Sequence, residues 1–350
     1  MNSVVPGSSA GATDADRWVL GVDVGGTGSR AALEPLEPLA PPPGGDPGPG
    51  GGDHDAATAG RRVLEGGRAV VAPCGSTPEV AAELIEAAHA EWPDATIVAI
   101  GIGATGLASL VTSPGTALGR LGRAAGGGTP LALTIDAVAA HLGALGGRAG
   151  AVVSVDTAAI AIGTDLRSHW RRVGGWGHLW DDRGSAAWIG IEALKAAIQT
   201  HDRVTDDAQA LLSAAVDRFG PAHEWPAHLL TREDRAGLLA GFATDVAQLA
   251  ASGDHLATDI MGRAGSAVAA TLAAALDPDL PQLASGVGGV FAADGAFTAS
   301  FEQEFARLAP SAELIAPAGT PLDGAVRLAR LVAAGDVPAG HPPFLWISRG

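Results

Sequence analysis

The sequence has few of the residues on which several classes of protein depend. Cys74 is its only cysteine, so one chain forms no intrachain disulfide and holds no zinc or iron–sulfur cluster through thiolates. No stretch contains the roughly 18 uncharged apolar residues that a membrane span requires. The first 17 residues also lack the basic start and apolar run of a secretory signal. We expect a cytoplasmic protein that does not enter a membrane.

Basic residues are scarce as well. Lysine and arginine together number 22 against 38 aspartate and glutamate residues, which gives a formal net charge of −16. Without a localised basic patch, this charge repels nucleic acid and anionic membrane surfaces. A repressor would need a helix-turn-helix segment, for which the 17-residue N-terminal tail is too short. The expected partner is therefore a small molecule.

The chain of 350 residues is long enough for two α/β lobes. In the first half, alternating β-branched residues predict a strand at 18–24, with "RAAL" as its hairpin partner. Residues 34–60 are rich in proline and glycine and predict a mobile insert at the tip of this hairpin. A third strand is expected at 69–72, and a looser glycine-rich segment is expected to lead up to Thr129. Further strands "TIVAIGIG" and "LALTID" flank this segment, and helices are expected at "TPEVAAELIEAAHAEW" and "AVAAHLGAL".

The second half repeats this order of elements. The strand "GAVVSVD" opens a new round of strands, followed by mostly helical sequence from Gly184 to Leu276. The strand "PQLASGVGGVF", a helix, the strand "AELIAP" and the helix "TPLDGAVRLARLVAAG" complete the chain. The repeat predicts two α/β lobes with a cleft between them.

Two strand ends carry aspartates of chemical interest. In "LGVDVGGTGSR", Asp23 precedes glycines whose N–H groups can surround a phosphate, while its carboxylate can hold Mg²⁺ through water. An ordinary tight hairpin is the alternative reading. Asp136 ends the strand "LALTID" and begins a helix, where a carboxylate can accept the proton of an attacking hydroxyl. It can equally serve as the N-cap of that helix.

The stretch "RRVGGWGHLWDDRGSAAWIG" is the most specific in the chain. Its glycines, tryptophans, histidine and paired carboxylates suit a polyhydroxylated ring, which offers hydroxyls to several acceptors and an apolar face to a flat surface. The alternative is a packed turn with Trp176 in the core. A later turn, "GVGGVF", could admit an adenine and ribose closely because two glycines follow a strand.

With these turns in this order, the sequence resembles the N-acetylglucosamine kinase group of the superfamily of sugar kinases, heat-shock ATPases and actin. That group belongs to the broader BadF/BadG/BcrA/BcrD ATPase family. The resemblance runs from Trp18 to Ala334 and is most specific in "GGWGHLWDDRGSAAWIG". It implies an α/β fold of two actin-like (ribonuclease H-like) lobes with a central cleft. The expected lobes comprise residues 18–140 with 320–346, and residues 141–319.

The resemblance also implies a role for particular residues, with ATP and Mg²⁺ as cofactors. Asp136 would be the base for a sugar 6-hydroxyl, and Asp23 would manage Mg²⁺. Proteins of this kind are commonly dimers, so a homodimer is an expectation. The remaining implied contacts are Gly25, Gly26, Thr27 and Ser29 with the ATP phosphates, Gly288 and Gly289 with adenosine, Trp176, Gly177 and His178 with the C2 side of the sugar, and Asp182 with a ring hydroxyl.

Two departures from the family pattern concern the acceptor. Asp156, beside Thr157, and Asp181 stand where the family usually has glycine. A carboxylate attracts a sugar's 2-ammonium group, whereas N-acetylation removes that charge. These departures predict a kinase that phosphorylates glucosamine at O6 and leave open which aspartate meets the amine. The alternatives are an N-acetylglucosamine or glucose kinase, a catalytically silent sugar sensor and, least compatible with one cysteine, an ATPase activator of a reductase.

Overall fold

A computed structural model describes residues 17–26, 28–36, 60–69, 76–107, 114–293, 295–337 and 340–350. Thr27 and most of the proline- and glycine-rich insert lie outside the described residues. The chain forms two compact units, one of residues 1–143 with 320–350 and one of residues 144–319. Among the described helices, none is long and apolar enough to cross a membrane.

Unit 1 is built on a six-stranded sheet in the order β11-β5-β4-β1-β2-β3. Strands β1, β4 and β5 are parallel, so their carboxyl ends meet at one edge of the sheet, while β2, β3 and β11 pair antiparallel to their neighbours. The strands are β1 (Arg17–Val24), β2 (Ser29–Pro35), β3 (Arg62–Gly66), β4 (Thr96–Ala104), β5 (Leu131–Ile135) and β11 (Leu345–Ser348).

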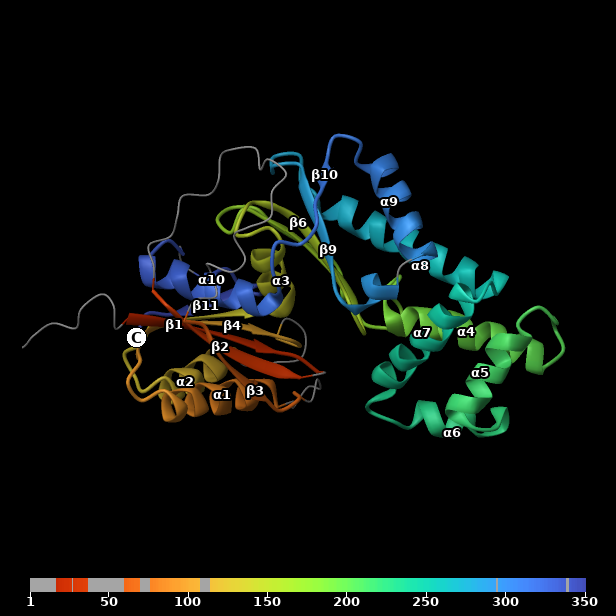
Figure 1. Ribbon diagram of the computed structural model, residues 1–350, viewed down its shortest axis with the longest axis horizontal. Coiled ribbons are helices and arrows are strands. Elements are labelled where there is room, and N and C mark those ends of the chain that lie inside the picture. Colours follow the sequence, from red (N-terminus) through yellow and green to blue (C-terminus); the bar gives the residue numbers. More distant parts are fainter. Residues whose placement is uncertain are drawn as a thin grey trace, which may run out of the picture. The chain divides into compact units, whose positions relative to one another are not determined.

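Helices cover both faces of this sheet. Figure 1 shows α1 (Thr77–Glu91) and α2 (Pro114–Ala124) on one face, with α3 (Asp136–Ala144) and α10 (Pro321–Ala334) on the other. Helix α10 lies against β4 so closely that a Cβ on Gly101 would stand 2.1 Å from the carbonyl oxygen of Ala325. Only glycine allows this approach, which fixes the returning chain to the first lobe.

Unit 2 is built on a five-stranded sheet in the order β10-β9-β6-β7-β8. Strands β6 and β9 are parallel, and β7 pairs antiparallel with β6 and with β8. The strands are β6 (Gly150–Val155), β7 (Ala159–Thr164), β8 (Trp170–Gly174), β9 (Leu283–Val287) and β10 (Glu313–Leu314).

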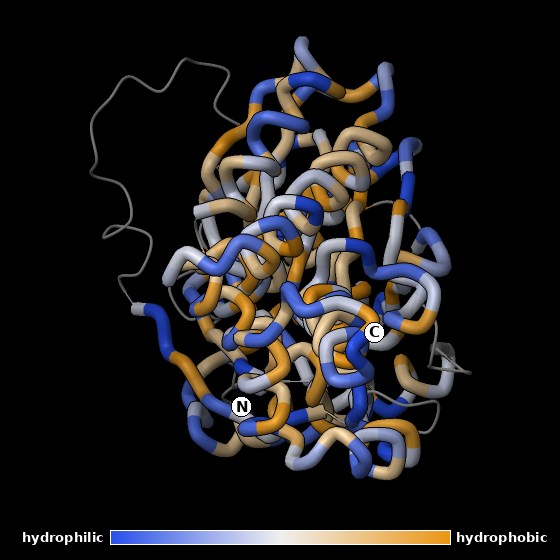
Figure 2. The backbone as a smooth tube through the Cα atoms, turned by 90° about the vertical axis from the view of Figure 1, so that its right-hand side faces the viewer, coloured by the Kyte–Doolittle hydropathy of each residue, from blue (hydrophilic) through white to orange (hydrophobic). Residues whose placement is uncertain are grey.

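The helices of unit 2 bury a large apolar core that includes Phe242, Phe297 and Phe305. Hydrophilic and hydrophobic residues follow one another along the coils of the backbone tube in Figure 2, as expected of helices with one buried face. The helices are α4 (Ala186–His201), α5 (Gln209–Phe219), α6 (Trp225–Leu230), α7 (Arg235–Ala251), α8 (His255–Ala275) and α9 (Ala296–Leu308), with 3₁₀ helices η2 (Ala222–Glu224) and η3 (Gly289–Ala293).

The expected α/β class and the order of its main elements are confirmed. Two local expectations are corrected, and one strand was not expected. The third strand lies at Arg62–Gly66, whereas Ala69 is outside any strand and residues 70–72 are not described. The segment before Thr129 contains helix α2, and the C-terminal strand β11 was not anticipated.

Candidate active site

Two aspartates lie at the same edge of the sheet in unit 1. Asp23 is the penultimate residue of β1 and pairs in register with Gly103 of β4, which pairs with Thr134 of β5. Asp136 follows β5 directly and is the first residue of α3, where its Oδ1 accepts the N–H of Ala137 at 2.8 Å. The carboxyl ends of parallel strands are the usual place for ligands in α/β sheets. Both carboxylates therefore stand where phosphoryl-transfer chemistry could use them.

The glycine turn after Asp23 is tight and connects β1 to β2. The Gly25 N–H donates to the carbonyl oxygen of Gly28 at 3.1 Å, and the Gly25 carbonyl accepts the N–H of Ala69 at 3.2 Å. No atom of the described residues lies within 4 Å of a Cβ placed on Gly28. The Ser29 side chain is 1 % exposed, and its hydroxyl finds no hydrogen-bond partner among the described residues. A buried hydroxyl beside an open glycine turn fits a site for phosphate oxygens.

A second turn, between β6 and β7, contacts the predicted adenosine loop. Asp156 Oδ1 accepts the N–H of Gly289 at 2.6 Å. The same turn meets the start of α4, because the carbonyl oxygens of Asp156 and Thr157 accept the N–H groups of Ala186 and Ala187 at 2.9 and 3.4 Å. Of the two predicted substrate residues, Asp156 therefore links the predicted adenosine loop to helix α4, and Thr157 contacts α4.

The tryptophan loop between β8 and α4 depends on glycine for its shape. Gly174, Gly175, Gly177 and Gly184 all have positive φ angles, between 73° and 102°, which glycine adopts at least cost. A Cβ on Gly184 would lie 2.4 Å from the carbonyl oxygen of Ala264 in α8, so the end of the loop rests directly on that helix.

The tryptophans of this loop lie on the surface rather than in the core. The exposed fractions are 66 % for Trp176 and 78 % for Trp180, whose indole N–H donates to the Trp176 carbonyl at 2.9 Å. The alternative reading, in which Trp176 fills the core, is wrong. Exposed, ordered aromatic rings on a polar loop suit the apolar face of a sugar.

The two carboxylates of the loop differ in exposure and in partners. Asp182 is 3 % exposed, and burial raises the pKa of its carboxyl even though the Gly177 N–H donates to it at 3.3 Å. Asp181 Oδ2 accepts the N–H of Trp176 at 3.2 Å, and its Oδ1 lies 3.6 Å from Nε of the exposed Arg183. Asp156 bonds instead to Gly289, so the two departures from the family pattern meet different parts of unit 2.

Two arginines that the sequence did not single out support the loop. The Arg172 guanidinium carbon lies 4.5 Å from the centre of the Trp176 ring, and its Nε donates to the Gly174 carbonyl at 3.0 Å. Arg235, at the start of α7, donates from Nε to His178 Nε2 at 3.4 Å. Burial and the positive charge of Arg235 lower the pKa of His178. The basic pair before the glycines could have indicated Arg172, but Arg235 is 57 residues away from His178 and gave no signal.

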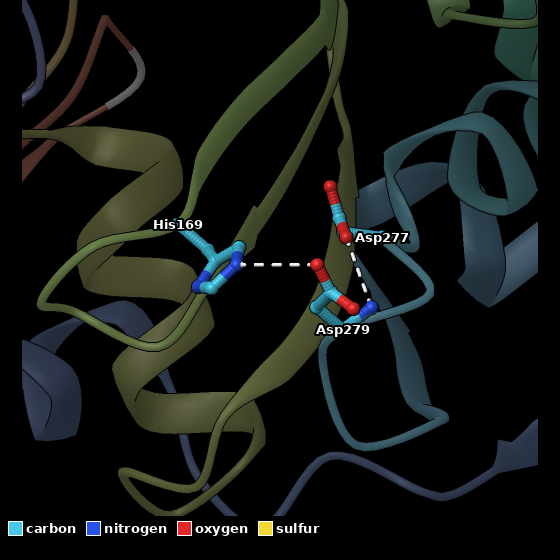
Figure 3. A group of neighbouring side chains, drawn as sticks. All are labelled: His169, Asp277 and Asp279. Atoms are coloured by element: carbon cyan, nitrogen blue, oxygen red, sulfur yellow. Dashed lines mark hydrogen bonds and ion pairs between the residues drawn. The ribbon is translucent and has the colours of Figure 1, made fainter.

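A further group of polar residues lies at the opposite end of β7 from Asp156. His169, Asp277 and Asp279 have possible ligand atoms within 4.8 Å of one another, and Figure 3 shows the imidazole facing Asp279. Asp165 accepts the N–H groups of Arg167, Ser168 and His169, and its hydrogen bond to the imidazole raises the pKa of His169. These hydrogen bonds to Asp165 hold the turn between β7 and β8, which lies at a different place from the glycine turns described above.

The comparison with protein families decides the classification. The profile of the BadF/BadG/BcrA/BcrD ATPase family matches residues 20–329. The chain belongs to this family. The resemblance inferred from the glycine turns is thereby confirmed.

Individual relatives are more distant. A curated N-acetylmuramic acid/N-acetylglucosamine kinase from Clostridium acetobutylicum is 40 % identical over 68 residues, which span 19 % of this chain and 22 % of that protein. A candidate N-acetylglucosamine kinase from Chromobacterium violaceum is 24 % identical, with a TM-score of 0.64 over 90 % of this chain and 99 % of that one.

Two further solved structures share the fold. A candidate N-acetylglucosamine kinase from Porphyromonas gingivalis is 15 % identical, with a TM-score of 0.58 over 89 % of this chain and 98 % of that one. A ROK family glucokinase from Streptomyces griseus is 18 % identical, with a TM-score of 0.51 over 90 % and 98 % of the two chains. These likenesses confirm the actin-like fold class.

Proposed function

We propose that this protein is an ATP-dependent kinase that phosphorylates the 6-hydroxyl of an amino sugar, with glucosamine as the acceptor. The observation that carries the proposal is the position of Asp23 and Asp136 at one sheet edge, in a member of an ATPase family. One carboxylate can hold a metal ion and the other can accept a proton, and both are groups that enzymes of phosphoryl transfer use.

The first turn of unit 1 would hold the phosphates. The Gly25 N–H is already donated to Gly28, so the following N–H groups of this turn and the buried Ser29 hydroxyl would be the donors to phosphate oxygens. Asp23 would hold Mg²⁺ through water, and the bound ion would neutralise charge on the transferring phosphoryl group. Gly25, Gly26 and Thr27 are proposed here as phosphate contacts, and Gly288 and Gly289 as contacts of the adenosine.

Asp136 would act as the general base. An ionised carboxylate accepts the proton of the attacking 6-hydroxyl while the new oxygen–phosphorus bond forms and the bond to the leaving ADP breaks. Its Oδ1 accepts a hydrogen bond from the Ala137 N–H, which orients the carboxylate.

The tryptophan loop would bind the acceptor. Trp176 presents an exposed ring supported by Arg172, and His178 is held by Arg235. Asp182 would accept a ring hydroxyl. Among the aspartates that depart from the family pattern, we assign the amine to Asp181, because it belongs to this loop and the cation beside it, Arg183, is exposed and 3.6 Å away.

N-acetylglucosamine is the second candidate acceptor. The name of the curated relative includes this substrate. In addition, Asp181 and Asp182 each accept a backbone N–H of the loop, which occupies part of their capacity to bind an ammonium group. A neutral amide would suit a loop whose carboxylates are already bonded.

A coupled assay of ADP release tests the proposal. Purified protein with ATP and Mg²⁺ is offered glucosamine, N-acetylglucosamine, glucose and mannosamine, with Asp136→Asn as the control. Turnover of glucosamine alone is the expected result, with at least about tenfold discrimination, because a hydrogen bond that involves charged groups contributes about 1.5–3 kcal/mol and the N-acetyl group lacks the charge. Turnover of N-acetylglucosamine alone would show that this sugar is the acceptor, and the proposal of a sugar kinase would stand. Failure of every sugar to cause ADP release would refute the kinase and favour a sensor.

A further inference from the structure

Asp156 stands at the point where two strands of unit 2 end together. Strands β6 and β9 run parallel, with Ser154 paired in register with Val287. The residues that follow this pair are therefore neighbours at the strand ends, Val155 and Asp156 on the side of β6 and Gly288 and Gly289 on the side of β9. The carboxyl ends of parallel strands are where α/β sheets bind ligands, so the geometry of this junction bears on ligand binding.

Gly288 allows the backbone after β9 to approach the backbone at the end of β6 closely. Its φ is +112°, and a Cβ at this residue would lie 2.3 Å from the carbonyl oxygen of Val155. No other residue type fits such an approach between backbones. The close passage places the Gly289 N–H 2.6 Å from Asp156 Oδ1.

The loop after β9 has a second anchor on its other side. The ring of Phe291 lies against Gly286, where a Cβ would be 2.4 Å from its Cζ, and packs edge-on against Phe297 and Phe301. The Phe291 N–H also donates to the Gly288 carbonyl at 3.2 Å. The apolar core thus holds the loop at Phe291, and the hydrogen bond to Asp156 holds it at Gly289.

We infer that Asp156 is a positioning residue for the nucleotide loop at Gly288–Gly289 and not a contact of the acceptor's amine. The inference rests on the proposed function in assigning nucleotide to this loop. The backbone of Asp156 is bonded to Ala186 at the start of α4, so the carboxylate is held on a fixed turn. A short hydrogen bond from a backbone N–H to an ionised carboxylate is stronger than one between neutral groups, which suits a contact that orders a loop.

The test compares Asp156→Ala, which removes the acceptor, with Asp156→Asn, which retains Oδ1 as an acceptor. Asp217→Ala, on the exposed face of α5, is the matched control. The KM values for MgATP and for the acceptor are measured in each, together with hydrogen exchange of the peptide containing Gly289. With Asp156→Ala we expect about a tenfold rise in the KM for MgATP, faster exchange at Gly289 and an unchanged KM for the acceptor. The neutral oxygen in Asp156→Asn should keep a weaker hydrogen bond, so its KM for MgATP should rise less than that of Asp156→Ala, and the control should stay within about threefold of the parent protein.

Three results would overturn the inference. A rise in the KM for glucosamine with Asp156→Ala, at constant KM for MgATP, would return the carboxylate to the amine. Equal losses with Asp156→Asn and Asp156→Ala would assign its role to charge and not to the hydrogen bond. Unchanged exchange at Gly289 in both variants would show that the bond does not order the loop.

The same variants separate this inference from the proposed function. If the parent protein phosphorylates no sugar, the Kd for MgADP from calorimetry replaces the KM for MgATP. A weaker Kd and faster exchange for Asp156→Ala would then support the positioning role even though the kinase proposal had failed. An unchanged Kd would overturn the role.

Discussion

Single side chains in this protein differ in the chemistry that their surroundings allow. Asp136 is bonded at Oδ1 to the N–H of the next residue, Ala137, so this contact and proton acceptance use the same carboxylate. The two roles are compatible because a carboxylate has about four lone-pair sites.

Replacing Asp136 with asparagine tests the catalytic role alone. The asparagine amide keeps an oxygen for the Ala137 N–H and loses the basic group, so Asp136→Asn should lower kcat by about 10²–10⁴-fold. The KM for the sugar and the thermal stability should change little. Steady-state kinetics and a melting curve measure both, and a kcat within about threefold of the parent value would exclude Asp136 as the base.

His178 offers a residue-scale prediction with a defined sign. Burial first and the Arg235 charge second lower the pKa of this imidazole. Removing the charge in Arg235→Gln should therefore raise the pKa of His178, while burial still keeps it below the ordinary value. Measurement by NMR titration of the ring protons should show the rise, with Arg167→Gln, on an exposed turn, as a control without effect. A lower pKa in Arg235→Gln would contradict this reading.

At the scale of elements, the tryptophan loop packs directly on helix α8 because the loop has glycine at the point of contact. Gly177 and Gly184 have similar positive φ angles of 102° and 83°, but only Gly184 has an atom of the described residues within 4 Å of an added Cβ, the Ala264 carbonyl at 2.4 Å. Both substitutions by alanine carry the backbone cost of about 1–2 kcal/mol.

Gly184→Ala should additionally suffer overpacking and lose about 1–3 kcal/mol more than Gly177→Ala. Chemical denaturation of the two variants measures the difference in the free energy of unfolding. Equal losses would mean that α8 and the loop can separate without cost.

Sequence patterns predicted the buried elements better than the exposed ones. The apolar strands β1, β4, β5 and β6 and the periodic helices α4, α7 and α8 follow from burial on a fixed period. Strand β3 was misplaced because its residues, "RVLEG", are nearly all exposed and do not alternate.

Helix α2 was missed for a different reason. Glycines at 115, 119 and 122 each disfavour a helix by about 1 kcal/mol relative to alanine. Burial of Ala117 and Leu121 in the packed unit overrides that cost, and a local pattern does not reveal such tertiary packing.

In the candidate site too, some residues could be predicted from the sequence and others could not. Turn residues such as Asp23, Asp136 and the tryptophan loop were predictable because glycine, aspartate and strand ends are local signals. The partners of Asp156 and His178 were not, because Gly289 and Arg235 lie 133 and 57 residues away in the chain. Only the fold brings these pairs together.

At the scale of the whole molecule, nucleotide binding should be visible in stability. A ligand at about a hundred times its Kd adds about 2.7 kcal/mol to the free energy of unfolding. MgATP should therefore raise the melting temperature by several degrees, and Asp23→Asn should reduce the part of the rise that depends on Mg²⁺. Differential scanning fluorimetry with ATP, with and without Mg²⁺, measures both effects. The absence of any shift at saturating MgATP would contradict ATP binding.

The path of the chain has a consequence for how the protein can be rebuilt. Unit 2 is inserted between Gly143 and Thr320 of unit 1, and its two ends are joined by a hydrogen bond from the Ala318 N–H to the Ala144 carbonyl at 2.9 Å. In unit 1, a Cβ on Gly324 of α10 would lie 2.8 Å from the Gly143 nitrogen, so the cut points there are also close. A short linker could thus close either unit after excision, and loop closure over so few residues costs little entropy. The gene could be divided into two separately expressed halves, each with a single uninterrupted chain.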